Sequence, residues 1–485
     1  MHRFVIGVIV LAAASTPALA QDAPLSQLVV NLFRPENYSN AVGVGPNHTA
    51  HFQISGGTAG TEILFLNAAL VNQAIITQLT SLPLGSSSGG FTYSFDPELG
   101  TFDRTSDSFG PSLAERSLTN GRGKFNFGIT FQSSEFDSFE GKDLDGGLDF
   151  FLLHNDCCKP PGNGIRTTPA FEGDLVQSTL SMNLRMRSML FYFNYGITDR
   201  FDVAVVLPFT SVDVSATNVA TLQRLSTDIN PNIHFFTGET RDQVTFTDSG
   251  SASGIGDIAV RAKWNFYRLT GGGLAAGFEY RAPTGDEEDL LGLGTWQTKF
   301  SFIASSDFNG FAPHFNIGYK FTGEPPSSLN DVQFPQLQGV DAPTNPSITQ
   351  EVPKTLTLSE VDIAPDEFNY AVGFDWAVHP RATIAADILG RRLINAGRLR
   401  EFPFEHQFRV EGTDGNVLAD DGPVRTATFS QLFLDPVSVD QIFAAVGAKF
   451  NVGSTFLLSV NVLFALTNEG LRDDIVPIIG FDYVF

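Results

Sequence analysis

Histidine, cysteine and acidic side chains are the residues of this sequence that could bind a metal or carry out catalysis. The eight His residues are not paired at the H-E-x-x-H spacing of a metal site, and no G-x-S-x-G nucleophile elbow is present. His48 and His51 are three residues apart in NHTAHF, whose composition indicates a loop rather than a metal site. The sequence therefore predicts no bound metal, no cofactor and no enzymatic activity.

Two other clusters carry reactive or charged groups. Cys157 and Cys158 are adjacent in NDCCKPPGNG, and in an oxidising compartment they could form a strained vicinal disulfide, as a loop clip or as a redox group. The acidic run at 286–289 could bind divalent cations, or it could simply be a solvated face. Both clusters are expected in loops.

A third set of charged residues alternates with apolar residues. In IAVRAKWNF (258–266) the apolar residues are at even positions, whereas Arg261 and Lys263 are at odd ones. That period of two is typical of a β-strand with one apolar and one polar face. By the same parity we expect the following residues on the polar side: Arg185, Arg187, Arg261, Lys263, Glu279, Arg281, Asp387 and Arg391. They would line a conduction path, or form ion pairs with one another and with a plug.

The strands that must position these residues recur along the chain from residue 123 to its end. Alternating segments lie at 125–131, 176–186, 258–266, 368–376 and 456–464, and the last one is IVPIIGFDYVF (475–485). An alternating terminal strand that ends in an aromatic residue resembles the closing strand of bacterial outer-membrane barrels. The resemblance implies an assembly signal formed by Phe481, Tyr483 and Phe485.

The connections between these segments alternate between tight and long. Tight turns are expected at 197–201, 269–273, 306–310, 378–381 and 451–455, and long loops at 141–173, 218–253, 322–366 and 392–440. Short periplasmic turns that alternate with long outer loops are typical of outer-membrane barrels. The sequence predicts an all-β fold: an antiparallel transmembrane β-barrel of about twelve strands, or of fourteen if two more strands precede residue 123.

The N-terminal part divides into two segments. Residues 1–20 have a short charged start, an apolar run and the small-residue site Ala18-Leu19-Ala20, as in a secretory signal peptide. Residues 21–122 are expected to form a partly helical plug or cap, with an amphipathic helix at 61–79 that packs on protein or, alternatively, on the membrane surface. Glu115 and Arg116 are the candidate plug contacts, and residues 123–485 are the barrel.

Composition agrees with this assignment. The chain has 45 Phe but only 30 Lys and Arg, and its formal net charge is −23. This balance argues against nucleic-acid binding, which needs a basic surface. We expect the protein to be located in the cell outer membrane. Its partners would be the lipid and lipopolysaccharide of that membrane and the barrel-assembly machinery.

A family resemblance is carried by several motifs in order. These are SSSGGFTYSFDPELGTFDRTSDSFGPSLAERS (86–117), GRGKFNFGITFQ (121–132), SGIGDIAVRAKWNF (253–266), YRAPTGDEEDLLGLG (280–294) and ADILGR (386–391). Together they resemble the MetA-pathway of phenol degradation family, a set of outer-membrane transporter-like barrels. The plan is more distantly similar to the long-chain fatty-acid and aromatic-hydrocarbon channels, although their Asn-Pro-Ala start is missing here.

The resemblance implies a channel for passive uptake of small hydrophobic or aromatic compounds. Two alternatives belong to other classes. A structural or adhesive surface barrel would act through its long outer loops, and an outer-membrane hydrolase would need Ser and His at the barrel rim.

Overall fold

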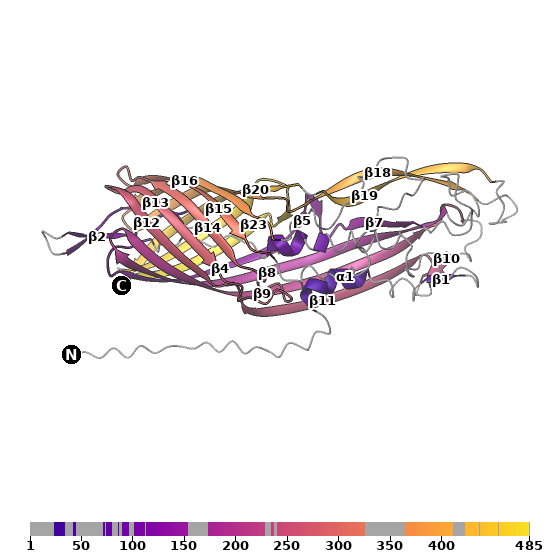
Figure 1. The fold of residues 1–485 in the computed structure, drawn as a ribbon, viewed down its shortest axis with the longest axis horizontal. Coiled ribbons are helices and arrows are strands. Elements are labelled where there is room, and N and C mark those ends of the chain that lie inside the picture. The colour runs from indigo at the N-terminus through magenta and orange to yellow at the C-terminus, as the bar shows by residue number, and fades with distance from the viewer. Residues whose placement is uncertain are drawn as a thin grey trace.

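A computed structural model of the chain shows that nearly all of its described regular elements are β-strands (Figure 1). The structure describes residues 24–33, 42–44, 71–72, 74–79, 86, 90–96, 101–111, 113–153, 173–227, 234–236, 240–324, 364–410, 422–435, 437–453 and 455–484. The expected signal peptide, the pair His48 and His51, the pair Cys157 and Cys158, and the terminal Phe485 lie outside these residues. In the described part of the chain, no helix is long and apolar enough to cross a membrane.

Twelve antiparallel strands form a closed barrel, which confirms the predicted fold. β8 pairs with both β4 and β9, and β23 pairs with β4, so no strand of the ring has a free edge along the wall. In ring order the strands are β4 (Phe125–Phe136), β8 (Leu175–Thr198), β9 (Phe201–Gln223), β12 (Ala259–Leu269), β13 (Gly272–Arg281), β14 (Gln297–Ser305), β15 (Phe311–Thr322), β16 (Glu367–His379), β17 (Ala382–Leu393), β20 (Val439–Gly453), β21 (Phe456–Ala465) and β23 (Ile475–Val484).

The alternative of fourteen barrel strands is wrong. Two further strands belong to the same sheet but lie outside the closed ring. β7 (Leu148–Leu153) pairs with the first part of β8, and β11 (Gln243–Ile255) pairs with the last part of β9. With about 3.3 Å per residue, the 24 residues of β8 reach roughly 80 Å, far beyond a hydrocarbon core of about 30 Å. The four strands therefore continue as a sheet beyond the barrel (Figure 1).

Three expected loops are consequently wrong. The segment 141–173 holds β7, which pairs with β8. The segment 218–253 holds the end of β9 and most of β11, because these strands stay paired outside the barrel. The segment 392–440 holds the hairpin of β18 (Arg398–Arg409) and β19 (Val424–Asp435), which extends in the same direction. The predicted tight turns are confirmed between β8 and β9, β12 and β13, β14 and β15, and β16 and β17. They lie at the other end of the barrel, here called the turn end, and the extended sheet projects from the loop end.

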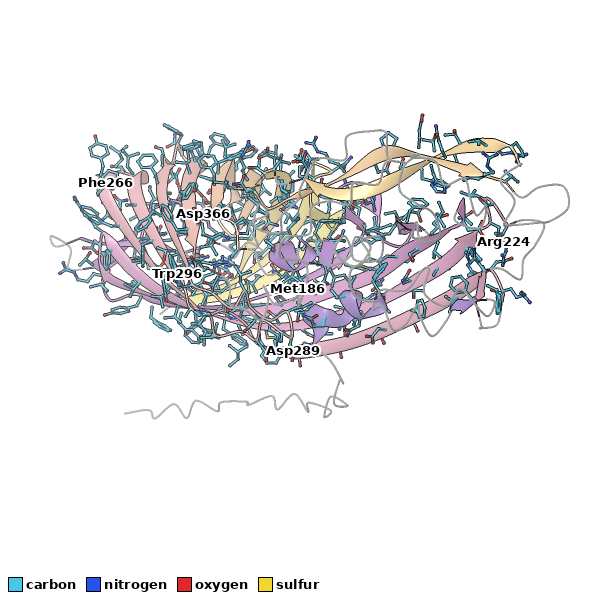
Figure 2. The ribbon with its side chains drawn as sticks, turned by 45° about the vertical axis from the view of Figure 1, so that its right-hand side comes forward. Met186, Arg224, Phe266, Asp289, Trp296 and Asp366 are labelled. Carbon is cyan, nitrogen blue, oxygen red and sulfur yellow. The ribbon has the colours of Figure 1, made fainter. Side chains whose placement is uncertain are left out.

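The outer face of the barrel is apolar and rich in aromatic side chains. Trp264, Phe300, Phe315, Val372 and Val460 are among the large apolar residues exposed there. Figure 2 shows Phe266 at the turn end, with Arg224 at the far end of the extended sheet and Met186 between them. Such a band matches the lipid-facing surface of an outer-membrane barrel, whose inside is polar.

The N-terminal residues pack on the inner side of the extended sheet. α1 (Leu28–Leu32), after the 3-10 turn Leu25–Gln27, contacts β9 and β11. Residues 71, 72 and 74–79 are helical, and Val71, Ile75 and Leu79 are buried in the same apolar core. This part of the expected helix at 61–79 therefore packs on protein, and its remainder lies outside the described residues.

Short strands complete the structure at both ends of the barrel. At the far end of the extended sheet β1 pairs with β10, and at the loop end β22 pairs with β5, which pairs with β6. The hairpin of β2 and β3 lies at the turn end (Figure 1). Their bounds are β1 (Val42–Val44), β2 (Tyr93–Asp96), β3 (Thr101–Arg104), β5 (Ser138–Phe139), β6 (Lys142–Asp143), β10 (His234–Phe236) and β22 (Leu471–Arg472).

Loss of the last aromatic residue is expected to impair assembly of the barrel. β23 joins β4 to β21, and Phe481 and Tyr483 are exposed on its lipid face. We expect deletion of Phe485 to lower the amount of protein in the outer membrane several-fold, because the resemblance assigns the assembly signal to this end. Immunoblots of outer-membrane fractions would measure it, with the exposed Asp474→Asn as the control at the opposite end of the strand. Equal amounts of both variants would contradict the assignment.

Candidate functional site

A segment before the first barrel strand lies across the lumen at the turn end. This plug segment, residues 106–120, is bound mainly by inward-facing polar side chains of the wall. The hydroxyl of Ser106 donates a hydrogen bond to Asp307. Glu115 donates its backbone N–H to Asn316, and Asn120 donates its backbone N–H to Asp202. Further hydrogen bonds join Ser108 to Asp375, Phe109 to Thr383, Ser117 to Ser305 and Asn265, and Lys449 to the carbonyl of Pro111. The contacts come from seven strands, so the segment is tied around much of the lumen.

The two predicted plug contacts act differently. Glu115 reaches the wall, with its carboxylate 3.3 Å from Lys263 Nζ and 3.9 Å from Arg261 Nη1. Arg116 instead donates to the backbone carbonyls of Ser108 and Gly90, and it thereby fixes the fold of the plug itself. Burial lowers the pKa of Arg116, and the nearby Asp375 acts against this shift. Its backbone carbonyl accepts a hydrogen bond from Lys263 of the wall.

On the loop-end side of the plug, charged residues of neighbouring strands face each other in register. This charged belt comprises Arg261, Glu279, Lys299, Lys320 and Glu367, one from each of β12 to β16. Glu279 accepts from Arg261 Nε at 2.6 Å and from Arg281 Nε at 2.8 Å, and Lys320 lies 2.7 Å from Glu367. Successive side chains of a strand point to opposite faces. The aromatic residues therefore face lipid, and these charged residues face the lumen.

A cavity of about 160 Å³ lies between the charged belt and the plug segment. Its wall includes the small inward residues Gly277, Ser301, Gly318 and Ala371, which leave the space that larger side chains would fill. A Cβ atom at Gly318 would lie only 3.2 Å from Lys299 Cε, so the glycine accommodates the lysine chain. The barrel interior is therefore not completely packed.

The structure brings most of the predicted lumen residues together. Arg261, Lys263, Glu279, Arg281 and Arg391 all line the cavity, and Arg391 Nε donates to Gln441 Oε1 at 2.7 Å. Asp387 also faces inward, but it lies outside the cavity wall and bonds His314. A role of these residues in transport stays a prediction.

The placement of Arg185 and Arg187 in the lumen is wrong. They alternate with the buried Leu184 and Met186, and Arg185 forms a 2.7 Å ion pair with Glu135 on the exposed face. By parity alone, the apolar face of this part of β8 would face lipid. It packs instead on the N-terminal helices, because β8 continues past the membrane, so the arginines face outward.

Several inward residues were not selected from the sequence. Lys299, Lys320 and Glu367 follow the same alternation, since each is followed by a phenylalanine on the opposite face of its strand. Applying the parity to every strand would have found them. Their pairing across β14, β15 and β16 could not be read without the register.

Buried His314, with two aspartates and a serine nearby, is the arrangement among the described residues that most resembles a Ser-His-Asp catalytic triad. His314 Nε2 lies 2.6 Å from Asp387, and its Nδ1 lies 3.4 Å from Asp375. Ser108 donates its hydroxyl to Asp375 rather than to the imidazole. Since a carboxylate faces each ring nitrogen, neither is placed to take a proton from a serine. This cluster instead ties the plug segment to β16.

The acidic run at 286–289 makes hydrogen bonds within its own loop and to the N-terminal segment. In the acidic run, Asp286 accepts hydrogen bonds from the backbone of Glu288 and Asp289, and the carbonyl of Glu288 accepts one from Ser26. Among the described residues, no group of three His, Cys, Asp or Glu side chains is placed to hold a metal ion. The charged belt and its cavity are thus the candidate site.

A closed antiparallel ring, apolar outside and polar inside, defines a transmembrane β-barrel of the bacterial outer-membrane type. The family described as "Putative MetA-pathway of phenol degradation" matches residues 173–345, which confirms the resemblance over that part of the chain. No curated protein sequence matches the chain.

Several solved structures are similar to the chain. The COG4313 outer membrane channel from Pseudomonas putida F1 is 12% identical, with a TM-score of 0.40, and the match covers 76% of this chain and 98% of that one. The CymD monoaromatic hydrocarbon channel is 11% identical (TM-score 0.28; 75% and 89% covered). A Pseudomonas aeruginosa FadL homologue is 8% identical (TM-score 0.29; 75% and 89% covered). The barrel assignment rests on the strand pairing of this chain.

Proposed function

We propose that the protein is a passive channel for small hydrophobic or aromatic molecules across the outer membrane. The observation that carries the proposal is the cavity inside a closed barrel, between the plug segment and the loop end. A barrel of this size has room for a small ligand or a narrow path. An engineered cavity of about 150 Å³ holds benzene, so about 160 Å³ suits one aromatic ring.

The proposal involves neither an energy source nor covalent chemistry. The phenol-degradation description of the matching family supports an aromatic solute. Because lipopolysaccharide slows apolar solutes, a protein path through the barrel would be useful to the cell. The plug segment would then control passage, and the hydrogen bonds that hold it would set how readily it yields.

Uptake measurements test this function. Cells that lack the protein are expected to take up monoaromatic substrates several-fold more slowly at low external concentration, and the wild-type chain should restore uptake. A fatty acid included in the panel would separate aromatic from general hydrophobic passage. Unchanged uptake across the panel, with normal barrel assembly in the parent cells, would refute the proposal. Turnover of an ester, or loss of surface adhesion alone, would support the hydrolase or the adhesive barrel instead.

A further inference from the structure

The charged belt contains one unfavourable neighbour pair. Along the belt each contact between strands joins opposite charges except the one between β14 and β15, where Lys299 and Lys320 are direct register partners. Like charges directly opposite on neighbouring strands destabilise a sheet. Lys320 is compensated by Glu367 at 2.7 Å. Lys299 instead has Glu279 as its register partner on β13, a carboxylate that already accepts hydrogen bonds from Arg261 and Arg281.

Lys299 also differs from the other cations of the cavity wall in its hydrogen bonding. Arg261 and Arg281 donate to Glu279, Lys263 to Glu115, and Arg391 to Gln441. Among the described residues Lys299 makes no direct hydrogen bond or ion pair, although the carboxylates of Glu279 and Glu367 are near enough to attract its charge. Lys299 lines the cavity, so its ammonium group can donate hydrogen bonds to a molecule inside.

The cavity as a whole has an excess of positive charge. Its wall contains six cations and four carboxylates, an excess of two positive charges in a chain whose net charge is −23. Such focused charge raises the local concentration of anions. The cations are Arg261, Lys263, Arg281, Lys299, Lys320 and Arg391, and the carboxylates are Glu115, Asp202, Glu279 and Glu367.

Another part of the cavity wall is apolar. Leu113 of the plug segment, Leu389 of β17 and Phe443 of β20 line it, and they pack against a buried cluster of Ala445, Leu463, Val476 and Ile478. The same cavity thus offers a cationic region and a region that would bury an aromatic ring. A molecule that matches both has a negatively charged head and a small apolar body.

From this arrangement we propose that the cavity is a binding site for small aromatic carboxylates. Lys299 donates hydrogen bonds to the carboxylate, and the ring lies against Leu389 and Phe443. The inference rests on the proposed function, because it specifies which aromatic molecules the barrel accepts. A charge-assisted hydrogen bond is short and strong, so the carboxylate is preferred over a neutral group of the same shape.

Binding to the purified full-length barrel in a non-ionic detergent tests the site. Benzoate is the probe, benzyl alcohol is its neutral counterpart, and acetate is the head group without the ring. We expect benzoate to bind about tenfold more tightly than benzyl alcohol, and Lys299→Gln to weaken benzoate binding about tenfold. Arg392→Gln is the matched control, since it removes one positive charge from the opposite, exposed face of β17 and should leave the affinity unchanged. Heat-modifiability on gels verifies that both variants are folded.

The outcomes separate the site from the proposed function. Equal affinity for benzoate and benzyl alcohol, or no effect of Lys299→Gln in a folded barrel, would overturn the carboxylate site even if cells still take up neutral aromatics through the protein. Acetate that binds as tightly as benzoate would overturn the role of Leu389 and Phe443. Benzoate binding that depends on Lys299 supports the site, even where the uptake panel shows no transport.

Discussion

Deletion of the plug segment, residues 106–120, is expected to turn the barrel into an open pore. The wall of twelve strands is closed by its own hydrogen bonds and does not need the plug to complete it. A ring of this size without internal side-chain layers leaves room for an aqueous path. We expect the single-channel conductance in planar bilayers to rise by about an order of magnitude.

A second variant tests the same effect without shortening the chain. Ser108→Ala combined with Glu115→Ala and Ser117→Ala removes side-chain contacts of the plug with β16, β12 and β14. This variant should show frequent transient openings rather than a permanent pore, because other hydrogen bonds remain. The single substitution Ser117→Ala serves as the control and should conduct like the wild type. Unchanged conductance in the deletion variant, with a correctly assembled barrel, would show that another part of the chain closes the lumen.

Replacement of Glu279 by glutamine is expected to destabilise the barrel strongly. This carboxylate is 8% exposed and neutralises both Arg261 and Arg281. Removal of one partner from a buried ion pair costs about 3–5 kcal/mol, because the remaining charge stays buried without compensation. We expect the free energy of unfolding to fall by about 3 kcal/mol, measured by urea unfolding in lipid vesicles with tryptophan fluorescence.

The matched control is an exposed pair at the same end of the barrel. Asp440 lies 3.3 Å from Arg392, and both side chains are about half exposed. Such a surface pair contributes about 0–1 kcal/mol, so Asp440→Asn should change the free energy of unfolding little. If both substitutions shifted the unfolding curve equally, the charged belt would not be the stabilising network that its geometry indicates.

Residue patterns along the chain are enough to predict the class of the fold. Alternation such as that of Ala259–Leu269 determines which residues face lipid, because successive side chains of a strand point to opposite sides. The alternation of tight and long connections determined the approximate strand number and identified the turn end. Arg261, Lys263, Glu279, Arg281 and Arg391 were placed correctly in the lumen for the same reason, since parity requires no knowledge of the neighbouring strand.

Parity along one strand cannot predict what covers each face of that strand or which residues lie opposite on its neighbours. Whether an apolar face meets lipid or protein depends on how far a strand extends beyond the membrane, and this reversed the expected direction of Arg185 and Arg187 on β8. Register between strands is also non-local. Only the pairing of β14 with β15 places Lys299 opposite Lys320, and only the path of the plug segment through the lumen completes the cavity. Alternation in one strand carries no information about which residues lie opposite in the next.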